Sequence, residues 1–155
     1  MKNIAFYAGS FDPFTNGHLE LIRQASNTFD RVIIGIGVNP DKERRFDKNE
    51  MKTAIEESLA VENINNCKVI IYKGYTWESA KENKSSILIR GLRNETDYHY
   101  EEEIAKFNDQ HGIDTIYLRA RKYGNISSSF VYKELLLGKD ISSFVPEPVK
   151  KLILK

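Results

Sequence analysis

The chain has little cysteine, almost no net charge and no long apolar run, and each shortage excludes a class of protein. A single cysteine, Cys67, among 155 residues excludes an internal disulfide framework and a zinc site built from several cysteines. The formal net charge of +1 offers no bulk electrostatic attraction to nucleic acid or to a membrane surface. No apolar stretch approaches the roughly 18 residues that a membrane-spanning helix needs.

The chain also lacks repeats, low-complexity tracts and linker-like segments, so we expect a single domain over residues 1–155. An apolar strand pattern begins directly after the first residues, with no signal-peptide-like segment before it. We therefore expect a cytoplasmic protein. The low net charge described above leads us to expect no nucleic-acid and no membrane partner. Cys67 opens another apolar run, and we interpret it as a small packing residue rather than a reactive thiol.

Short apolar runs alternate with longer amphipathic segments along the chain. The apolar runs are rich in β-branched residues and predict buried strands at residues 3–8, 31–38, 68–72, 86–90 and 115–119. The amphipathic segments predict helices at residues 17–29, 48–61, 76–84 and 96–111, and C-terminal helices at 128–137 and from 147. This order is typical of an α/β, Rossmann-like fold, a doubly wound five-stranded parallel sheet of order 3-2-1-4-5.

Ligands of such sheets bind beyond the carboxyl ends of the strands, where the strand order reverses. The turn Gly9-Ser10-Phe11-Asp12-Pro13 follows the first strand and leads into a helix N-terminus, where backbone N–H groups and the helix dipole attract phosphate. An ordinary strand–helix turn explains glycine, aspartate and proline equally well. His18 on the first helical turn favours a phosphate site, because its ring can donate to a phosphoryl oxygen that gains charge in the transition state.

Basic and hydroxyl side chains follow two further strand ends. Lys42, after the second strand, can reach an anionic substrate, although a solvated loop explains its position equally well. We interpret Arg44 and Arg45 as solvated charges of the same loop. Ile126-Ser127-Ser128-Ser129 opens the helix after the fifth strand, where serines commonly cap and where hydroxyl and N–H groups also form a second anion site.

Arginines flank a glycine at the end of the fourth strand. Burial of Arg90 and Arg93 around Gly91 is costly without an anion or a carboxylate, so we favour a phosphate clamp over an interface salt bridge. The next helix carries the acidic run Glu101-Glu102-Glu103, which is most simply a solvated face. One of these carboxylates can accept from a nucleoside, and the spacing alone does not select it.

Together these segments resemble the nucleotidylyltransferase superfamily with its (H/T)-x-G-H and I-S-S-x signatures, and within it the phosphopantetheine adenylyltransferases. The resemblance covers nearly the whole chain through residues 9–18, 39–42 with Phe46, 90–93, 97–101 and 126–129. It implies adenylyl transfer from ATP to 4′-phosphopantetheine, giving dephospho-coenzyme A and pyrophosphate in coenzyme A biosynthesis. It also implies Mg²⁺ carried by ATP, a homohexamer and feedback by coenzyme A.

The resemblance further implies roles for individual residues. The catalytic residues would be His18, Lys42 and Arg93, with no protein ligand for the metal. The acceptor would contact Ser10, Lys42, Thr76 and Arg90. ATP would contact Ser10, Phe11, His18, Gly91, Leu92, Arg93, Glu101, Tyr123, Gly124, Asn125, Ile126, Ser127, Ser128 and Ser129.

The chain departs from the family pattern in one segment that bears on the acceptor. Gly74-Tyr75-Thr76-Trp77-Glu78-Ser79-Ala80 is bulkier and more polar than the usual apolar sequence that lines the pantetheine arm. Two alternatives therefore stay open, a nucleotidylyltransferase with another phosphate acceptor and a non-catalytic nucleotide-binding module. The sequence contains no evident nucleophile–base dyad, which fits direct attack by an acceptor phosphate that is already anionic.

Overall fold

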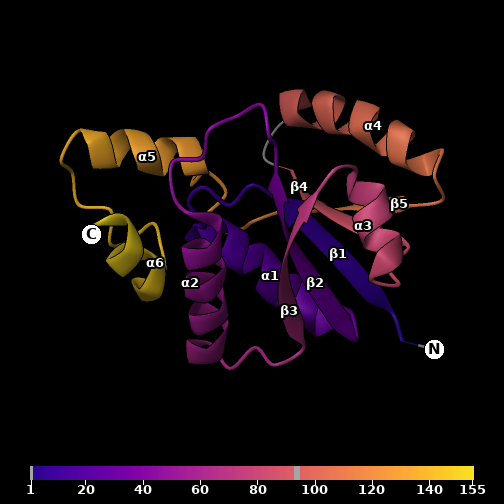
Figure 1. Ribbon diagram of the computed structural model, residues 1–155, viewed down its shortest axis with the longest axis horizontal. Coiled ribbons are helices and arrows are strands. Elements are labelled where there is room, and N and C mark those ends of the chain that lie inside the picture. Colours follow the sequence, from indigo (N-terminus) through magenta and orange to yellow (C-terminus); the bar gives the residue numbers. More distant parts are fainter. Residues whose placement is uncertain (1, 93–94) are drawn as a thin grey trace.

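The computed structural model describes residues 2–92 and 95–155, apart from the side chains of residues 95–101. Its strands form one parallel sheet of order β3-β2-β1-β4-β5, which confirms the predicted strand order (Figure 1). The strands are β1 (Ile4–Gly9), β2 (Arg31–Val38), β3 (Cys67–Lys73), β4 (Ile87–Gly91) and β5 (Asp114–Leu118). The helices are α1 (Asn16–Thr28), α2 (Lys48–Val61), α3 (Thr76–Glu82), α4 (Glu95–Asp109), α5 (Ser128–Leu136) and α6 (Glu147–Ile153).

The side chains of the central strand β1 alternate between two apolar clusters, one on each face of the sheet. Ala5 and Tyr7 belong to the larger cluster, which also contains the apolar faces of α1, α2 and α6. Phe6 and Ala8 belong to a smaller cluster with Ala80 of α3. Helices therefore cover both faces, as Figure 1 shows, and the sheet is doubly wound.

Capping residues decide where two of the helices begin. The Thr15 side chain accepts from the backbone N–H of His18, so α1 begins at Asn16, one residue before the predicted start. Asp47 accepts from the N–H groups of Asn49 and Glu50, so α2 begins at Lys48 as predicted. Other boundaries lie within about two residues of the predictions, which is the usual uncertainty at the ends of elements.

The C-terminal part of the chain returns to the start of α1. The Asn16 backbone N–H donates to the Phe144 carbonyl at 2.8 Å, and the Asn16 side-chain amide donates to the Ser143 carbonyl at 3.0 Å. Helix α6 packs against α2 (Figure 1). Cys67 is half-buried at the start of the edge strand β3, and burial raises the pKa of its thiol to about 11, as suits a packing residue. None of the helices in the described part of the chain has the length and apolar character that crossing a bilayer requires.

Candidate active site

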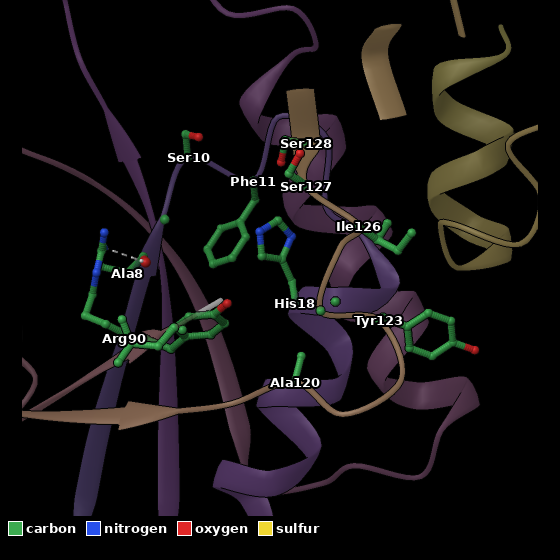
Figure 2. Close-up of a pocket in the computed structure, with 16 residues that line it drawn as sticks. Ala8, Ser10, Phe11, His18, Arg90, Ala120, Tyr123, Ile126, Ser127 and Ser128 are labelled. Atoms are coloured by element: carbon green, nitrogen blue, oxygen red, sulfur yellow. Dashed lines mark hydrogen bonds between the residues drawn. The ribbon is translucent and has the colours of Figure 1, made fainter. Parts of the chain in front are cut away.

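A cavity of about 290 Å³ lies at the carboxyl ends of β1 and β4, where the strand order reverses (Figure 2). We call it the central cavity. It brings together the β1–α1 turn, the end of β4 and the loop that precedes α5, as the sequence predicts. Its lining consists of Tyr7, Ala8, Gly9, Ser10, Phe11, Gly17, His18, Arg90, Gly91, Leu92, Ala120, Tyr123, Gly124, Ile126, Ser127 and Ser128.

The β1–α1 turn is held in an unusual backbone conformation by aromatic packing. Phe11 has a φ of 48°, in the left-handed region that non-glycine residues seldom adopt, and its side chain is buried. Its ring packs edge-on against Tyr7 at 5.4 Å and against Phe14 at 5.7 Å between centroids. Such strain persists only where the surroundings overdetermine it, and it is commonly found at functional sites. Ser10, immediately before Phe11, is thereby exposed at the mouth of the cavity.

The ring of His18 is oriented by aromatic neighbours and by a backbone hydrogen bond. It stacks on Phe14 at 5.5 Å and meets Phe11 edge-on at 4.9 Å. The Thr15 backbone N–H donates to His18 Nδ1 at 3.0 Å. Because Nδ1 accepts this bond, the proton of the neutral ring lies on Nε2. His18 lines the central cavity, and its role as a donor to phosphate through Nε2 stays a prediction.

Thr15 connects this histidine to the loop before α5. Its hydroxyl donates to the Ile126 carbonyl at 3.2 Å and accepts from the His18 backbone N–H at 3.3 Å. Together with the bond to Nδ1, Thr15 and His18 form a reciprocal capping box. Sequence reasoning missed this role of Thr15, although a threonine three residues before a polar side chain at a helix start is its signal.

The first turn of α1 touches the backbone of the same loop, and glycine is required there. A Cβ at Gly17 would lie 2.9 Å from the Tyr123 carbonyl oxygen and 3.0 Å from that of Ile126. Neither carbonyl can rotate away as a side chain can. Gly17 thus allows α1 and the loop to form two walls of one cavity.

Glu20, on α1, fixes the other end of this loop. Its carboxylate accepts from the backbone N–H groups of Arg121 at 2.9 Å, Lys122 at 3.0 and 3.2 Å, and Tyr123 at 3.0 Å. Burial raises the pKa of Glu20, but these backbone bonds outweigh it and the net pKa lies below the ordinary 4.5. No sequence signal points to this contact, because its partners lie about a hundred residues away along the chain.

A second cavity of about 130 Å³ adjoins the first and shares Ser10 and Ser128 with it. We call it the side cavity. It is lined by Ser10, Asp12, Gly37, Asn39, Lys42, Glu43, Arg44, Arg45, Ser128 and Ser129. Lys42 and Ser129 therefore lie beside the central cavity rather than in it. Ser128 lines both cavities, and its hydroxyl donates to the Pro13 carbonyl at 2.7 Å.

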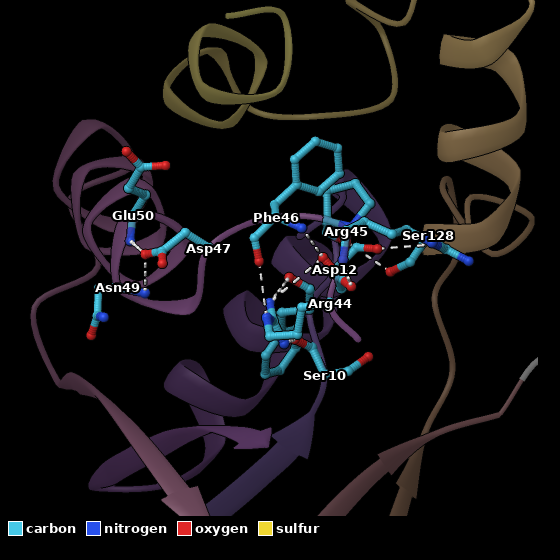
Figure 3. A network of polar contacts seen from close by, with 11 residues as sticks. Ser10, Asp12, Arg44, Arg45, Phe46, Asp47, Asn49, Glu50 and Ser128 are labelled. Atoms are coloured by element: carbon cyan, nitrogen blue, oxygen red, sulfur yellow. Dashed lines mark hydrogen bonds and ion pairs between the residues drawn. The ribbon is translucent and has the colours of Figure 1, made fainter. Parts of the chain in front are cut away.

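The interpretation as solvated charges is wrong for Arg44, whereas Arg45 is exposed as expected, although it too contacts the β1–α1 turn. Arg44 donates to the Ser10 carbonyl at 2.7 Å and to the Phe46 carbonyl at 3.0 Å, and only 15% of its side chain is exposed (Figure 3). Arg45 donates to the Asp12 carbonyl at 3.1 Å, and its guanidinium carbon lies 4.6 Å from the centre of the Tyr132 ring. Backbone carbonyls that leave the sheet need donors, and these arginines supply them.

The remaining predicted residues fall in several environments. Arg90 lines the central cavity and donates to the Ala8 carbonyl at 3.3 Å. The ring of Tyr123 points away from the His18 imidazole (Figure 2), with Lys122 Nζ 5.2 Å from its centre. Asn125 is exposed and absent from the lining of both cavities. Arg93 and the side chain of Glu101 lie outside the described residues.

The predicted acceptor residue Thr76 opens α3, away from both cavities. Its hydroxyl shares a hydrogen bond of 2.8 Å with the phenol of Tyr72, whose pKa is raised by burial. A shallow groove runs beside it, lined by Gly37, Val38, Asn39, Pro40, Tyr72, Gly74 and Tyr75. Among the residues described, no three His, Cys, Asp or Glu side chains gather in a way that could hold a metal ion.

The fold and the cavity define a class of parallel α/β proteins that handle nucleotide phosphates at a switch point. The sequence model of the cytidylyltransferase-like family matches residues 6–134, and the chain belongs to this family. Among solved structures it is similar in fold to a candidate nicotinate-nucleotide adenylyltransferase from Vibrio parahaemolyticus. The TM-score is 0.75 at 18% identity, over 99% of this chain and 93% of the other.

Curated relatives narrow the family further. The chain is 38% identical to a phosphopantetheine adenylyltransferase from Vesicomyosocius okutanii, over 99% of this chain and 98% of the relative. It is 41% identical to one from Leuconostoc mesenteroides, over 95% of this chain and 91% of the relative. The chain therefore belongs to the phosphopantetheine adenylyltransferases, which confirms the resemblance drawn from its motifs.

Proposed function

We propose that the protein transfers the adenylyl group of ATP to 4′-phosphopantetheine, giving dephospho-coenzyme A and pyrophosphate. The observation that carries this proposal is the pair of adjoining cavities that share Ser10 and Ser128. His18 lines one of them and Lys42 lines the other. Two anionic substrates can meet at the shared wall, and the names of the curated relatives specify which substrates they are.

The reaction follows from the groups at this wall. A phosphate oxygen of the acceptor attacks the α-phosphorus of ATP and forms a new P–O bond. The bond from the α-phosphorus to the oxygen that bridges to the β-phosphorus breaks, and pyrophosphate leaves with that oxygen. The attacking phosphate is already anionic near neutral pH, so no general base is required. The protein contributes alignment and compensation of charge.

His18 would donate from Nε2 to a non-bridging oxygen of the α-phosphate. Charge grows on that oxygen in the transition state, so the bond strengthens as the reaction proceeds. Phe11, Phe14 and the Thr15 N–H hold the ring before substrate arrives, and this preorganisation limits the cost of reorientation. Lys42 would bind the acceptor phosphate from the side cavity, and Arg90 would contact the same substrate from β4.

Mg²⁺ would accompany ATP and add positive charge beside the leaving pyrophosphate. The donor set of the central cavity suits this mode of binding, because its described lining offers hydroxyl, imidazole and guanidinium groups and no carboxylate. Ser127 and Ser128, at the start of α5, would face the phosphate chain with the N-terminal N–H groups of that helix. Tyr123, Gly124 and Ile126 would border the adenosine.

The acceptor would extend from Lys42 along the groove beside Asn39, Tyr72 and Tyr75 toward Thr76. The exposed Tyr75 ring makes this groove more aromatic than the family's usual apolar segment. We also infer a cytoplasmic homohexamer inhibited by coenzyme A. This inference is supported by the family membership and by large exposed apolar side chains such as Leu136 and Leu137.

The decisive experiment measures pyrophosphate release from Mg·ATP with 4′-phosphopantetheine, with nicotinamide mononucleotide and without acceptor. Release with 4′-phosphopantetheine alone is the expected result. Release only with nicotinamide mononucleotide would keep the chemistry and overturn the acceptor. No release in any arm, together with measurable ATP binding, would favour a non-catalytic nucleotide-binding module.

A further inference from the structure

Two largely covered charged side chains, Asp12 and Arg44, join the β1–α1 turn to the loop that carries Lys42. The Asp12 carboxylate, on the turn, accepts from the backbone N–H groups of Arg45 at 2.8 Å and Phe46 at 2.9 Å. In the other direction, the Arg44 guanidinium reaches from the loop to the carbonyl oxygens of Ser10 and Phe11 (Figure 3). Each segment thus supplies a charged side chain to the backbone of the other. We call this arrangement the Asp12–Arg44 clasp.

The clasp has the features of a fixed contact rather than a surface ion pair. Side-chain exposure is 15% for Arg44 and 13% for Asp12, and their closest charged atoms lie 3.7 Å apart. All three nitrogens of the guanidinium have carbonyl partners, the third being Phe46 O. A planar guanidinium that reaches several carbonyls at once defines an orientation, which an ammonium group on a flexible chain does not.

The clasp lies next to the residues proposed to hold the acceptor. Lys42 is two residues from Arg44, and the Ser10 carbonyl accepts a hydrogen bond from the Arg44 guanidinium. The first half of the loop is fixed locally, because the Asn39 side chain accepts from Asp41 N and its carbonyl accepts from Lys42 N. Lys42 therefore lies between a local turn and the clasp. Its position relative to Ser10 depends on both.

We propose that Arg44 is a positioning residue that sets Lys42 against Ser10 in the side cavity. The proposal rests on the adenylyl transfer proposed above. Without the guanidinium, the bonds from Asp12 to the Arg45 and Phe46 amides would still join the far end of the loop to the turn. The part of the loop nearest Lys42 would lose its contacts with the Ser10 and Phe11 carbonyls. The acceptor phosphate would then be held less accurately, and misplacement of a reacting group by about 1 Å can lower a rate by roughly 100-fold.

The test combines kinetics with hydrogen exchange in Arg44→Ala, Arg44→Lys and the surface control Arg23→Ala. In Arg44→Ala, kcat/KM for 4′-phosphopantetheine should fall by roughly 10- to 100-fold, with a much smaller change in KM for ATP. Arg44→Lys keeps the charge and loses the planar fork, so it should stay closer to Arg44→Ala than to the wild type. Full activity in Arg44→Lys would overturn the argument from geometry.

A double-mutant cycle separates positioning from a general structural role. If Arg44 acts through Lys42, then Arg44→Ala should have little further effect on kcat/KM for the acceptor in a Lys42→Ala background. An equal fall in both backgrounds would overturn the proposal.

Hydrogen exchange at the amides of residues 42–46 tests the clasp without any substrate. Faster exchange in Arg44→Ala, with β1 and β2 unchanged, is expected. Unchanged exchange in the loop would refute the clasp. A wild-type protein that is silent with 4′-phosphopantetheine would refute the proposed function, while the exchange result would still decide whether Arg44 holds the loop.

Discussion

Glu20 holds the loop that precedes α5 through backbone hydrogen bonds and does not line the central cavity. Its carboxylate is the shared acceptor for three consecutive backbone N–H groups, those of Arg121, Lys122 and Tyr123. The substitution Glu20→Gln keeps the size of the side chain and one acceptor oxygen. It replaces the other oxygen with an NH₂ group, which faces N–H donors and cannot accept from them. The loop should therefore detach at this end.

The size of the effect follows from the bonds that are lost. A hydrogen bond to a charged group contributes about 1.5–3 kcal/mol in a protected setting, and solvent screening at this partly exposed carboxylate reduces the loss to about 1 kcal/mol. A loss of about 1 kcal/mol lowers Tm by roughly 2–4 °C in a chain of this length. In the variant the loosened loop must be ordered again when ATP binds, and a cost of about 1 kcal/mol for this step raises KM for ATP by up to about fivefold.

The pH dependence has a definite sign. The folded-state pKa of Glu20 lies below its ordinary value of 4.5, so the carboxylate contributes to stability above that value. The contribution is lost as the pH falls through the folded-state pKa. The difference in the free energy of unfolding between wild type and Glu20→Gln should be constant between about pH 6 and pH 8 and should shrink below about pH 4.5.

Urea denaturation across this pH range and steady-state kinetics at neutral pH measure both effects. Glu56→Gln, which removes an exposed carboxylate from α2, is the matched control and should change neither quantity. If the difference in the free energy of unfolding between wild type and Glu20→Gln stayed constant down to the lowest pH, the stabilising role of the ionised Glu20 carboxylate would be refuted. A rise in KM for the acceptor as large as that for ATP would refute the local role of the loop.

Three further substitutions test the site. His18→Ala should lower kcat by about 10²- to 10³-fold in a pyrophosphate-release assay, because its donor acts mainly on the transition state. Lys42→Ala should raise KM for 4′-phosphopantetheine far more than KM for ATP in the same assay. Gly17→Ala should lower Tm in a thermal melt, since a Cβ at 2.9 Å from the Tyr123 carbonyl oxygen overpacks the site at a cost of about 1–3 kcal/mol.

Each of these has a simple control or contrary result. His111→Ala removes an imidazole outside both cavities and should leave kcat unchanged, whereas near-normal turnover in His18→Ala would remove its proposed role. An equal rise in KM for both substrates in Lys42→Ala would indicate a general defect in folding or charge. An unchanged melting temperature in Gly17→Ala would mean that the loop backbone yields without cost.

The strand order and nearly all element boundaries could be predicted because the local patterns agree with the tertiary structure. β-Branched runs such as Val32–Ile36 form strands that are buried on both faces, and they leave little choice of structure. The position of the cavity followed from topology, since parallel strands end at one edge. His18 could be assigned to it because turn, glycine and histidine are contiguous in the sequence.

The residues that hold the loops of the site in place, Glu20 and Arg44, could not be predicted, because they act through contacts between segments that are distant in the sequence. Glu20 and Arg121 are separated by 101 positions, and Arg44 and Ser10 by 34. A lone glutamate on a helix and an arginine in a charged loop are ordinarily solvated, and only the fold shows which backbone groups need them. The wrong interpretation of Arg44 arose from this lack of local signal.

The hydrogen bonds from Asn16 to residues 143 and 144 have a consequence for folding during synthesis. The β1–α1 turn leaves the ribosome more than a hundred residues before the segments that complete its surroundings. Ser128 contacts Pro13 across 115 positions, and Ser143 contacts Asn16 across 127. A nascent chain that ends before residue 120 has the β1–α1 turn and lacks the loop before α5, which lines the central cavity. Nucleotide binding should therefore appear only after residue 144 has left the ribosome, which makes it a direct marker that these distant segments have assembled.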